Sequence, residues 1–225
     1  MAELEEAVVA AATTTSHHLD EEMMPRVINV LSSLLQRVAE SNDLTRRFQP
    51  QRISAFHGLT RPTISVESYL DRIFKYANCS SSCYVVAYVY LDRFAHRQPS
   101  LPINSFNVHR LLITSVLVSA KFMDDIYYNN AFYGKVGGIS TAEMNLLEVD
   151  FLFGLGFQLN VTPTTYNTYC SHLQREMFLK SAPLHHNLGD PLQANLGRIS
   201  TVVKQHHFCF NTEDDQSTHQ QQLTV

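Results

Sequence analysis

The segment from residue 104 to residue 123 constrains the fold more than any other part of the chain. Taken as a helix, it carries apolar side chains in nearly every direction, at Leu111, Leu112, Ile113, Val116, Leu117, Val118 and Ala120. A helix that is apolar on all sides is stable in water only when other elements surround it. The sequence therefore predicts a buried central helix with several helical or strand partners.

Apolar residues at three- and four-residue spacing predict further helices on both sides of this segment. The expected helices cover about 65–78, 83–95, 131–135 and 141–155. Valine and tyrosine in segment 83–95 would also suit a strand, but the length of the segment favours a helix. Together with the central segment, these elements predict a five-helix bundle.

One more helix is expected at each end of the bundle. Pro25 suits the first turn of a helix that runs to about Ser41, and another helix covers about 162–178. The predicted fold class is therefore all-α, with a single five-helix domain and one flanking helix on each side.

Both terminal segments lack an apolar period. We expect a disordered tail over residues 1–24 and another over 181–225, which gains His and Gln. Between them lie an N-terminal helix and linker (25–62), the five-helix domain (63–160) and a C-terminal helix (161–180).

Composition argues against several classes of protein. The net charge is −4, and residues 65–160 hold seven Lys/Arg against eight Asp/Glu, so we expect no nucleic-acid partner. No long uncharged apolar run predicts a membrane span, and the acidic start is unlike a signal peptide. Four cysteines without secretory signals predict reduced thiols, and hence a place in the nucleus, the cytoplasm or both.

Lys121 and Glu148 are charged residues set among apolar neighbours on two of the expected helices. Lys121 could simply be a solvated side chain, which the helix dipole favours near a C-terminus. An unpaired buried carboxylate at Glu148 would cost several kcal/mol, so it either pairs internally, with Lys121 for example, or lies at an interface. We predict that both charges face outward, side by side, on a surface that binds another protein.

Several motifs resemble those of a known family. Residues 119–125, with Lys121 followed by two acids, resemble the helix-three signature of the cyclin box, and residues 91–94 resemble the close of its second helix. Residues 56–58, residues 64–73 and the expected first helix narrow the resemblance to the plant P-type (U-type) cyclins, related to the fungal phosphate-pathway cyclin. The resemblance covers roughly residues 25–180 and includes a single cyclin box.

This resemblance implies a regulatory subunit that binds and activates a cyclin-dependent protein kinase, most often of the PSTAIRE type. Such a subunit is not an enzyme and needs no cofactor, metal or small-molecule substrate. It would act in cell-cycle control of cell division or in phosphate and nutrient signalling. The alternative is a cyclin-fold module, similar to a transcription factor, that binds DNA or the transcription machinery.

By resemblance, the kinase-binding residues are Lys121, Phe122, Asp124, Glu148, Leu152 and Phe157. Lys121 would hydrogen-bond backbone carbonyls at the start of a kinase helix, while Glu148 orients it. Asp124 would reach a kinase cation, and Asp125 could instead cap the next helix. For each of the three apolar residues, a place in the core is an equal alternative.

Two further expectations concern the interior and the first helix of the box. Many cyclins contain an internal Arg–Asp pair, for which Asp92 supplies the acid and Arg72 is the candidate partner. The hydrophobic patch that binds Arg-x-Leu motifs in mitotic and S-phase cyclins is replaced at residues 63–69 by serines and a carboxylate. We therefore predict a structural ion pair and no Arg-x-Leu docking site.

No pattern of residues predicts catalysis or metal binding. Residues 134–138 lack the spacing of a phosphate-binding loop. Cys79 and Cys83 are four residues apart and residues 206–209 contain two histidines and a cysteine, but neither group has a second half to complete a tetrahedral site.

Overall fold

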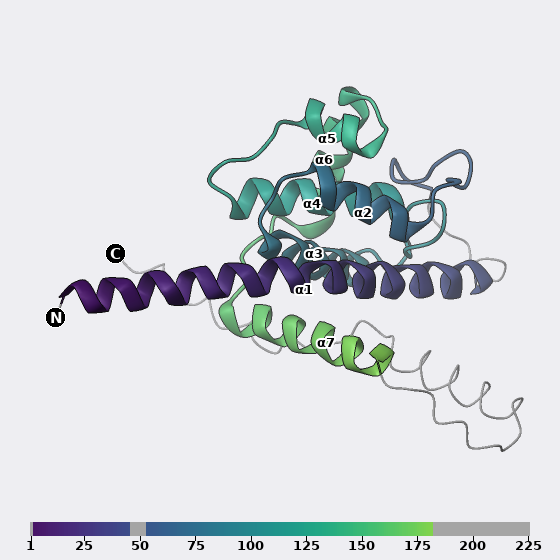
Figure 1. The fold of residues 1–225 in the computed structure, drawn as a ribbon. Coiled ribbons are helices and arrows are strands. Elements are labelled where there is room, and N and C mark those ends of the chain that lie inside the picture. Colours follow the sequence, from purple (N-terminus) through teal and green to yellow (C-terminus); the bar gives the residue numbers. More distant parts are fainter. Residues whose placement is uncertain (1, 46–52, 182–225) are drawn as a thin grey trace, which may run out of the picture. The chain divides into compact units, whose positions relative to one another are not determined.

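The computed structural model describes residues 2–45 and 53–181, with side chains described over 23–44 and 53–180. The described residues form seven helices and no strand (Figure 1). The helices are α1 (Ala2–Thr45), α2 (Val66–Tyr76), α3 (Ser81–Arg97), α4 (Val108–Met123), α5 (Asn130–Gly137), α6 (Thr141–Leu155) and α7 (Pro163–Ser181). The all-α class and the arrangement of five helices with one on each side are therefore confirmed, and the predicted C-terminal tail lies outside the described residues.

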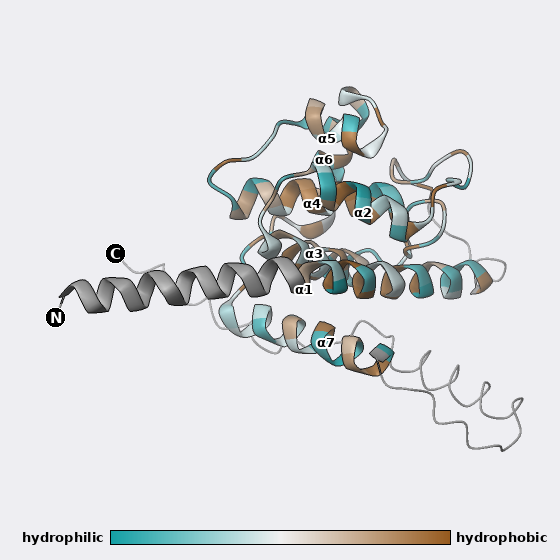
Figure 2. Cartoon of the chain, viewed as in Figure 1, coloured by the Kyte–Doolittle hydropathy of each residue, from teal (hydrophilic) through white to brown (hydrophobic). Residues whose placement is uncertain are grey.

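Helix α4 is the centre of the bundle. It contacts α2, α3, α5 and α6, and eleven of its residues, from Val108 to Ala120, are buried. Figure 2 colours much of this helix brown, for apolar residues. The prediction from its all-round apolar character is confirmed.

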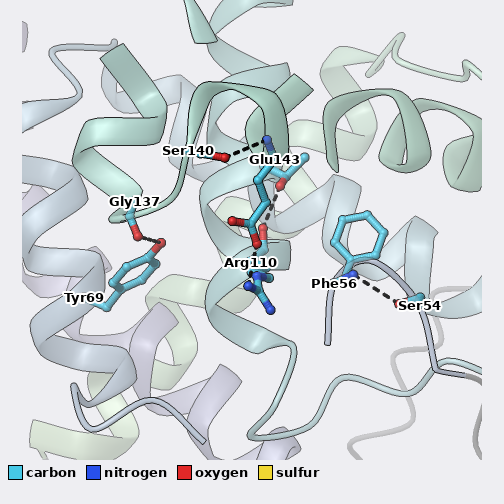
Figure 3. A network of polar contacts seen from close by, with 8 residues as sticks. Ser54, Phe56, Tyr69, Arg110, Gly137, Ser140 and Glu143 are labelled. Atoms are coloured by element: carbon cyan, nitrogen blue, oxygen red, sulfur yellow. Dashed lines mark hydrogen bonds and ion pairs between the residues drawn. The ribbon is translucent and has the colours of Figure 1, made fainter. Parts of the chain in front are cut away.

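Short polar side chains fix the starts of three helices. The Ser65 hydroxyl accepts a hydrogen bond from the Ser68 amide at the start of α2. Asn129 does the same for α5, and Ser140 for α6 (Figure 3). Helix α6 ends at Gly156, whose φ of 59° lies in the left-handed region that glycine adopts without strain.

Helix α1 differs from the expectation at its start. The structure continues the helix back to Ala2, whereas the sequence predicted a disordered tail before Pro25. Alanine and glutamate, frequent over residues 2–12, are strong helix formers and need no apolar stripe to favour a helix. Pro25 lies inside the helix, where it lacks the N–H that would bond to the preceding turn.

The C-terminal half of α1 packs on the bundle. Ile28, Leu31 and Leu35 are buried, and α1 contacts α2, α3 and α7. An ion pair between Arg37 and Glu176, with 3.0 Å between the nitrogen and the oxygen, joins α1 to α7. The two flanking helices therefore pack against each other as well as against the box.

Polar contacts tie α5 and α6 to the rest of the box (Figure 3). The Tyr69 hydroxyl on α2 donates to the carbonyl of Gly137 on α5, at 3.1 Å. Arg110 on α4 pairs with Glu143 in the first turn of α6. These contacts set the positions of the two helices that supply the functional site.

Candidate functional site

Lys121 and Glu148 meet at the surface. Lys121 lies in the last turn of α4 and Glu148 in the middle of α6, and the two helices pack against each other. The Lys121 Nζ is 2.6 Å from the Glu148 Oε1. The side chains retain 29% and 16% of their exposure, so the pair is neither sealed inside the bundle nor fully solvated.

Asn130, at the start of α5, holds the other oxygen of the same carboxylate. Its Nδ2 donates to Glu148 Oε2 at 2.6 Å and to Asn145 Oδ1 at 2.8 Å. Both carboxylate oxygens therefore have donors, while the Lys121 ammonium can still donate hydrogen bonds to another group. Sequence reasoning missed Asn130, because only the fold brings the start of α5 beside the middle of α6.

Asp124 has an internal role. Its Oδ2 accepts hydrogen bonds from the Ser80 amide at 3.0 Å and from the Cys83 thiol at 3.3 Å, at the start of α3. The hydrogen bond with Cys79, together with burial, raises the pKa of Cys83 and keeps it a thiol. A carboxylate at a helix N-terminus is favourable. The expectation that Asp125 caps the next helix is wrong, because Asn129 does so.

The predicted apolar contact residues differ in exposure. Phe122 is 48% exposed and Phe157 is 57% exposed, whereas Leu152 is half-buried. Phe157 follows the Gly156 cap with a φ of 59°, which is strained for a residue with a side chain. Its ring packs edge-on against Phe153, with 5.1 Å between the centroids.

Helix α6 carries apolar side chains on two faces. Met144, Leu147, Phe151 and Leu155 are buried against the bundle. The outward face exposes Leu146, Val149 and Phe153, the last at 67%, and sequence reasoning named none of them. Glu148 lies between these two faces. Exposed apolar side chains gathered on one helix face are typical of interaction sites in soluble proteins, so this face can bind another protein.

More exposed apolar residues lie at the end of α4 and in the connection to α5. Met123, Ile126, Tyr127 and Tyr128 lie between Lys121 and the start of α5, and all are exposed. The helices that carry the Lys121–Glu148 pair, and the connection between α4 and α5, therefore also expose apolar side chains. We use the name docking face for the ion pair and the exposed apolar residues around these elements. Its residues are Lys121, Phe122, Met123, Ile126, Tyr127, Tyr128, Leu146, Glu148, Val149, Phe153 and Phe157.

The predicted ion pair between Arg72 and Asp92 is wrong. The Arg72 guanidinium on α2 donates to the carbonyl of Lys135 on α5, at 3.1 Å. Asp92 is buried and accepts a hydrogen bond from the Tyr169 hydroxyl on α7, with His96 Nδ1 3.5 Å from its other oxygen. Burial raises the pKa of Asp92. Arg72 therefore joins α2 to α5, and Asp92 joins α3 to α7, but the two residues do not pair with each other.

The structure offers no metal cluster in the region it describes, where no three His, Cys, Asp or Glu side chains gather in a suitable group. Residues 206–209 lie outside that region. Among the helices described, none is both long and apolar enough to cross a membrane.

Comparison with known proteins identifies the family. The family model for cyclins matches residues 14–159. The chain is 64% identical over 202 residues to Cyclin-U4-1 of Arabidopsis thaliana, covering 89% of this chain and 93% of that one. It is 53% identical over 203 residues to Cyclin-P4-1 of Oryza sativa subsp. japonica, covering 88% and 89%. The chain therefore belongs to the cyclin family, and within it to the plant P-type or U-type cyclins.

Proposed function

We propose that this cyclin binds and activates a cyclin-dependent kinase of the PSTAIRE type through the docking face. The observation that carries the proposal is the 2.6 Å Lys121–Glu148 pair, which remains partly accessible at the border of the exposed apolar surface of α6. A partly exposed pair contributes about 1 kcal/mol or less to stability, so stability alone does not account for its placement.

The pair supplies the polar part of the interface. Glu148 and Asn130 fix the position of the Lys121 ammonium through two hydrogen bonds of 2.6 Å. The remaining N–H groups of Lys121 then donate to backbone carbonyls at the start of a kinase helix. Because the ammonium is already positioned, less conformational freedom is lost on binding.

The exposed aromatic residues supply the apolar part. Phe122, Phe153 and Phe157 expose enough ring surface to contribute to an interface of at least the standard size, about 1,600 Å² in total. Aromatic side chains in such a position contribute much of the binding free energy. The cyclin performs no chemistry; it activates the kinase by binding one of its conformations more tightly than the other.

The experiment measures binding of the purified chain to a PSTAIRE-type kinase, together with histone phosphorylation. Lys121→Ala and Glu148→Ala are each expected to weaken kinase binding at least tenfold, about 1.4 kcal/mol. Lys135→Ala is the matched control, because this exposed lysine of α5 lies outside the docking face.

The thermal unfolding of each variant separates binding from folding. A partly exposed ion pair contributes about 1 kcal/mol or less to stability, so the melting temperature should change little. Unchanged kinase binding by both variants would refute the proposal. A large fall in melting temperature for either variant would make that residue structural instead.

The biological setting of this kinase is part of the same proposal. We infer a role in cell-cycle control or in phosphate and nutrient signalling, in the nucleus, the cytoplasm or both. The cyclin names of the relatives are consistent with kinase regulation. Capture of the tagged chain followed by mass spectrometry of its kinase partner would test the PSTAIRE assignment.

A further inference from the structure

A cavity of about 570 Å³ lies far from the docking face. Its walls come from α1, residues 61–65, the first turns of α2 and α4, and Lys180 near the end of α7. The volume is within the range of small-ligand sites, about 300–1,000 Å³. His109 lines it at one end of α4, and Lys121 lies twelve residues further along, roughly 18 Å at the helical rise.

Among the described residues, three basic side chains line this cavity against one acid. Arg37 comes from α1, Arg61 from the segment before α2 and Lys180 from α7, while Glu67 is the acid. The Glu67 carboxylate accepts a hydrogen bond from the Asn29 amide at 3.0 Å. The basic groups therefore converge from three separate elements on one space.

Only part of this positive charge is neutralised within the fold. Arg37 pairs with Glu176, and its Nε is buried without a hydrogen-bond partner. Lys180 donates to the backbone carbonyl and the side-chain oxygen of Asn29, which are neutral acceptors. Arg61 is exposed and makes no ion pair or side-chain hydrogen bond to any residue that the structure describes. A bound anion would supply the missing charge.

The titration of neighbouring groups is consistent with this excess. Burial and the charge of Arg37 lower the pKa of Lys180. Burial lowers the pKa of His109 as well, with a smaller contribution from the charge of Arg61. Burial is the main cause in both cases. The nearby arginine adds a smaller effect of the same sign, which Glu67 and Glu176 partly offset at Lys180.

The hydroxyl groups in the wall add neutral donors. Ser33 and Thr63 line the cavity, whereas the Ser65 hydroxyl, also in the wall, caps α2 and donates its own hydrogen to the Ser68 hydroxyl. Tetrahedral phosphate groups accept several hydrogen bonds at once, and arginine can bind them with two parallel N–H groups. Carboxylates are planar and offer fewer acceptor directions to donors that converge from three elements.

We propose that this cavity binds a compact phosphorylated small molecule, held by Arg37, Arg61 and Lys180. The size of the cavity limits the ligand to a few phosphate groups on a small framework. This site is independent of the docking face, so it does not require the proposed kinase binding.

Isothermal titration calorimetry of the full chain, in a buffer without phosphate or sulfate, tests the proposal. The probes are pyrophosphate and fructose 1,6-bisphosphate, with citrate as a carboxylate probe of similar charge. We expect both phosphorylated probes to bind more tightly than citrate. Arg61→Gln and Lys180→Gln are each expected to weaken binding at least tenfold, and more salt should weaken it further.

Arg26→Gln is the matched control, because this exposed arginine of α1 does not line the cavity. It should leave the affinity for both probes unchanged. The proposal is overturned if neither phosphorylated probe binds, if citrate binds equally well, or if Arg26→Gln weakens binding as much as Arg61→Gln. A phosphoserine peptide that binds more tightly than both probes would overturn the small-molecule assignment. Kinase binding by Arg61→Gln should equal that of the unmodified chain, which keeps the two proposals separate.

Discussion

Gly154 sets how closely α6 approaches α3, and its replacement by alanine tests that packing. A Cβ atom at this position would lie 2.2 Å from Cε2 and 2.7 Å from Cδ2 of Phe94. Ordinary contact begins at about 3.4 Å, so the two groups must separate by roughly 1 Å. Phe94 cannot move easily, because it is buried and its ring packs on Phe151 and Phe56, with centroids 5.0 Å and 5.4 Å away.

Two opposing effects decide how much Gly154→Ala changes the free energy of unfolding. Alanine stabilises a helix interior by about 1 kcal/mol relative to glycine. Extra volume in a well-packed core costs about 1–3 kcal/mol in the free energy of unfolding. Because the Phe94 ring cannot move easily, we expect a cost near the upper end of this range for Gly154→Ala. We therefore expect a net loss of about 2 kcal/mol in the free energy of unfolding. For a chain of this size that loss lowers the melting temperature by roughly 4–8 °C.

Thermal unfolding followed by circular dichroism measures the effect, and Phe94→Leu provides the control background. Phe94→Leu is itself destabilising, but it removes the nearest atom that Gly154→Ala would meet, Cε2, together with Cζ, and leaves a side chain that can change rotamer. In that background Gly154→Ala should be neutral or stabilising, because only the helix propensity remains. An unchanged or higher melting temperature for Gly154→Ala alone would refute the packing argument.

Two more predictions concern buried polar groups. Burial lowers the pKa of His109 in the folded chain, so the unfolded chain binds a proton first as the pH falls below about 6.5, and stability decreases there. Unfolding experiments at several pH values should show that His109→Gln loses less stability as the pH falls. The difference from the unmodified chain is up to about 1.4 kcal/mol per pH unit. Tyr169→Phe should lower the free energy of unfolding by about 1–3 kcal/mol, because it leaves the buried Asp92 carboxylate without its donor. Urea denaturation would measure this loss. Asp92→Asn keeps an acceptor oxygen and removes the charge, so it should cost less than Tyr169→Phe. An equal cost would contradict the view that the buried charge of Asp92 needs the Tyr169 donor.

Much of the fold could be predicted from the sequence, because it depends on local periodicity. The all-round apolar character of segment 104–123 requires a central helix, and the structure buries α4 on all sides. The predicted range 141–155 coincides with α6, because Ser140 and Gly156 are strong start and stop signals. Lys121 and Glu148 could be singled out because each is a charge among apolar neighbours, and the structure brings them together.

Other features depend on tertiary geometry that one sequence does not contain. Asp92 could have met any of several basic or hydroxyl groups, and the approach of α7 gives it Tyr169. Arg72 donates to the backbone carbonyl of Lys135, a contact that cannot be predicted by matching opposite charges in the sequence. The exposure of Phe153 also escapes prediction, because an apolar residue in a helix rich in such residues is expected in the core.

The position of α5 explains why the Lys121–Glu148 pair stays at the surface. This short helix starts at Asn130, and the Tyr69 hydroxyl bonds its last carbonyl, so both ends are fixed to the box. Asn130 gives the second oxygen of the partly buried Glu148 carboxylate a donor. Each carboxylate oxygen then accepts a hydrogen bond, and the ammonium keeps N–H groups for a partner. The docking face therefore offers a partner an oriented ammonium group near exposed apolar side chains, and such a group can donate hydrogen bonds to backbone carbonyls of the partner.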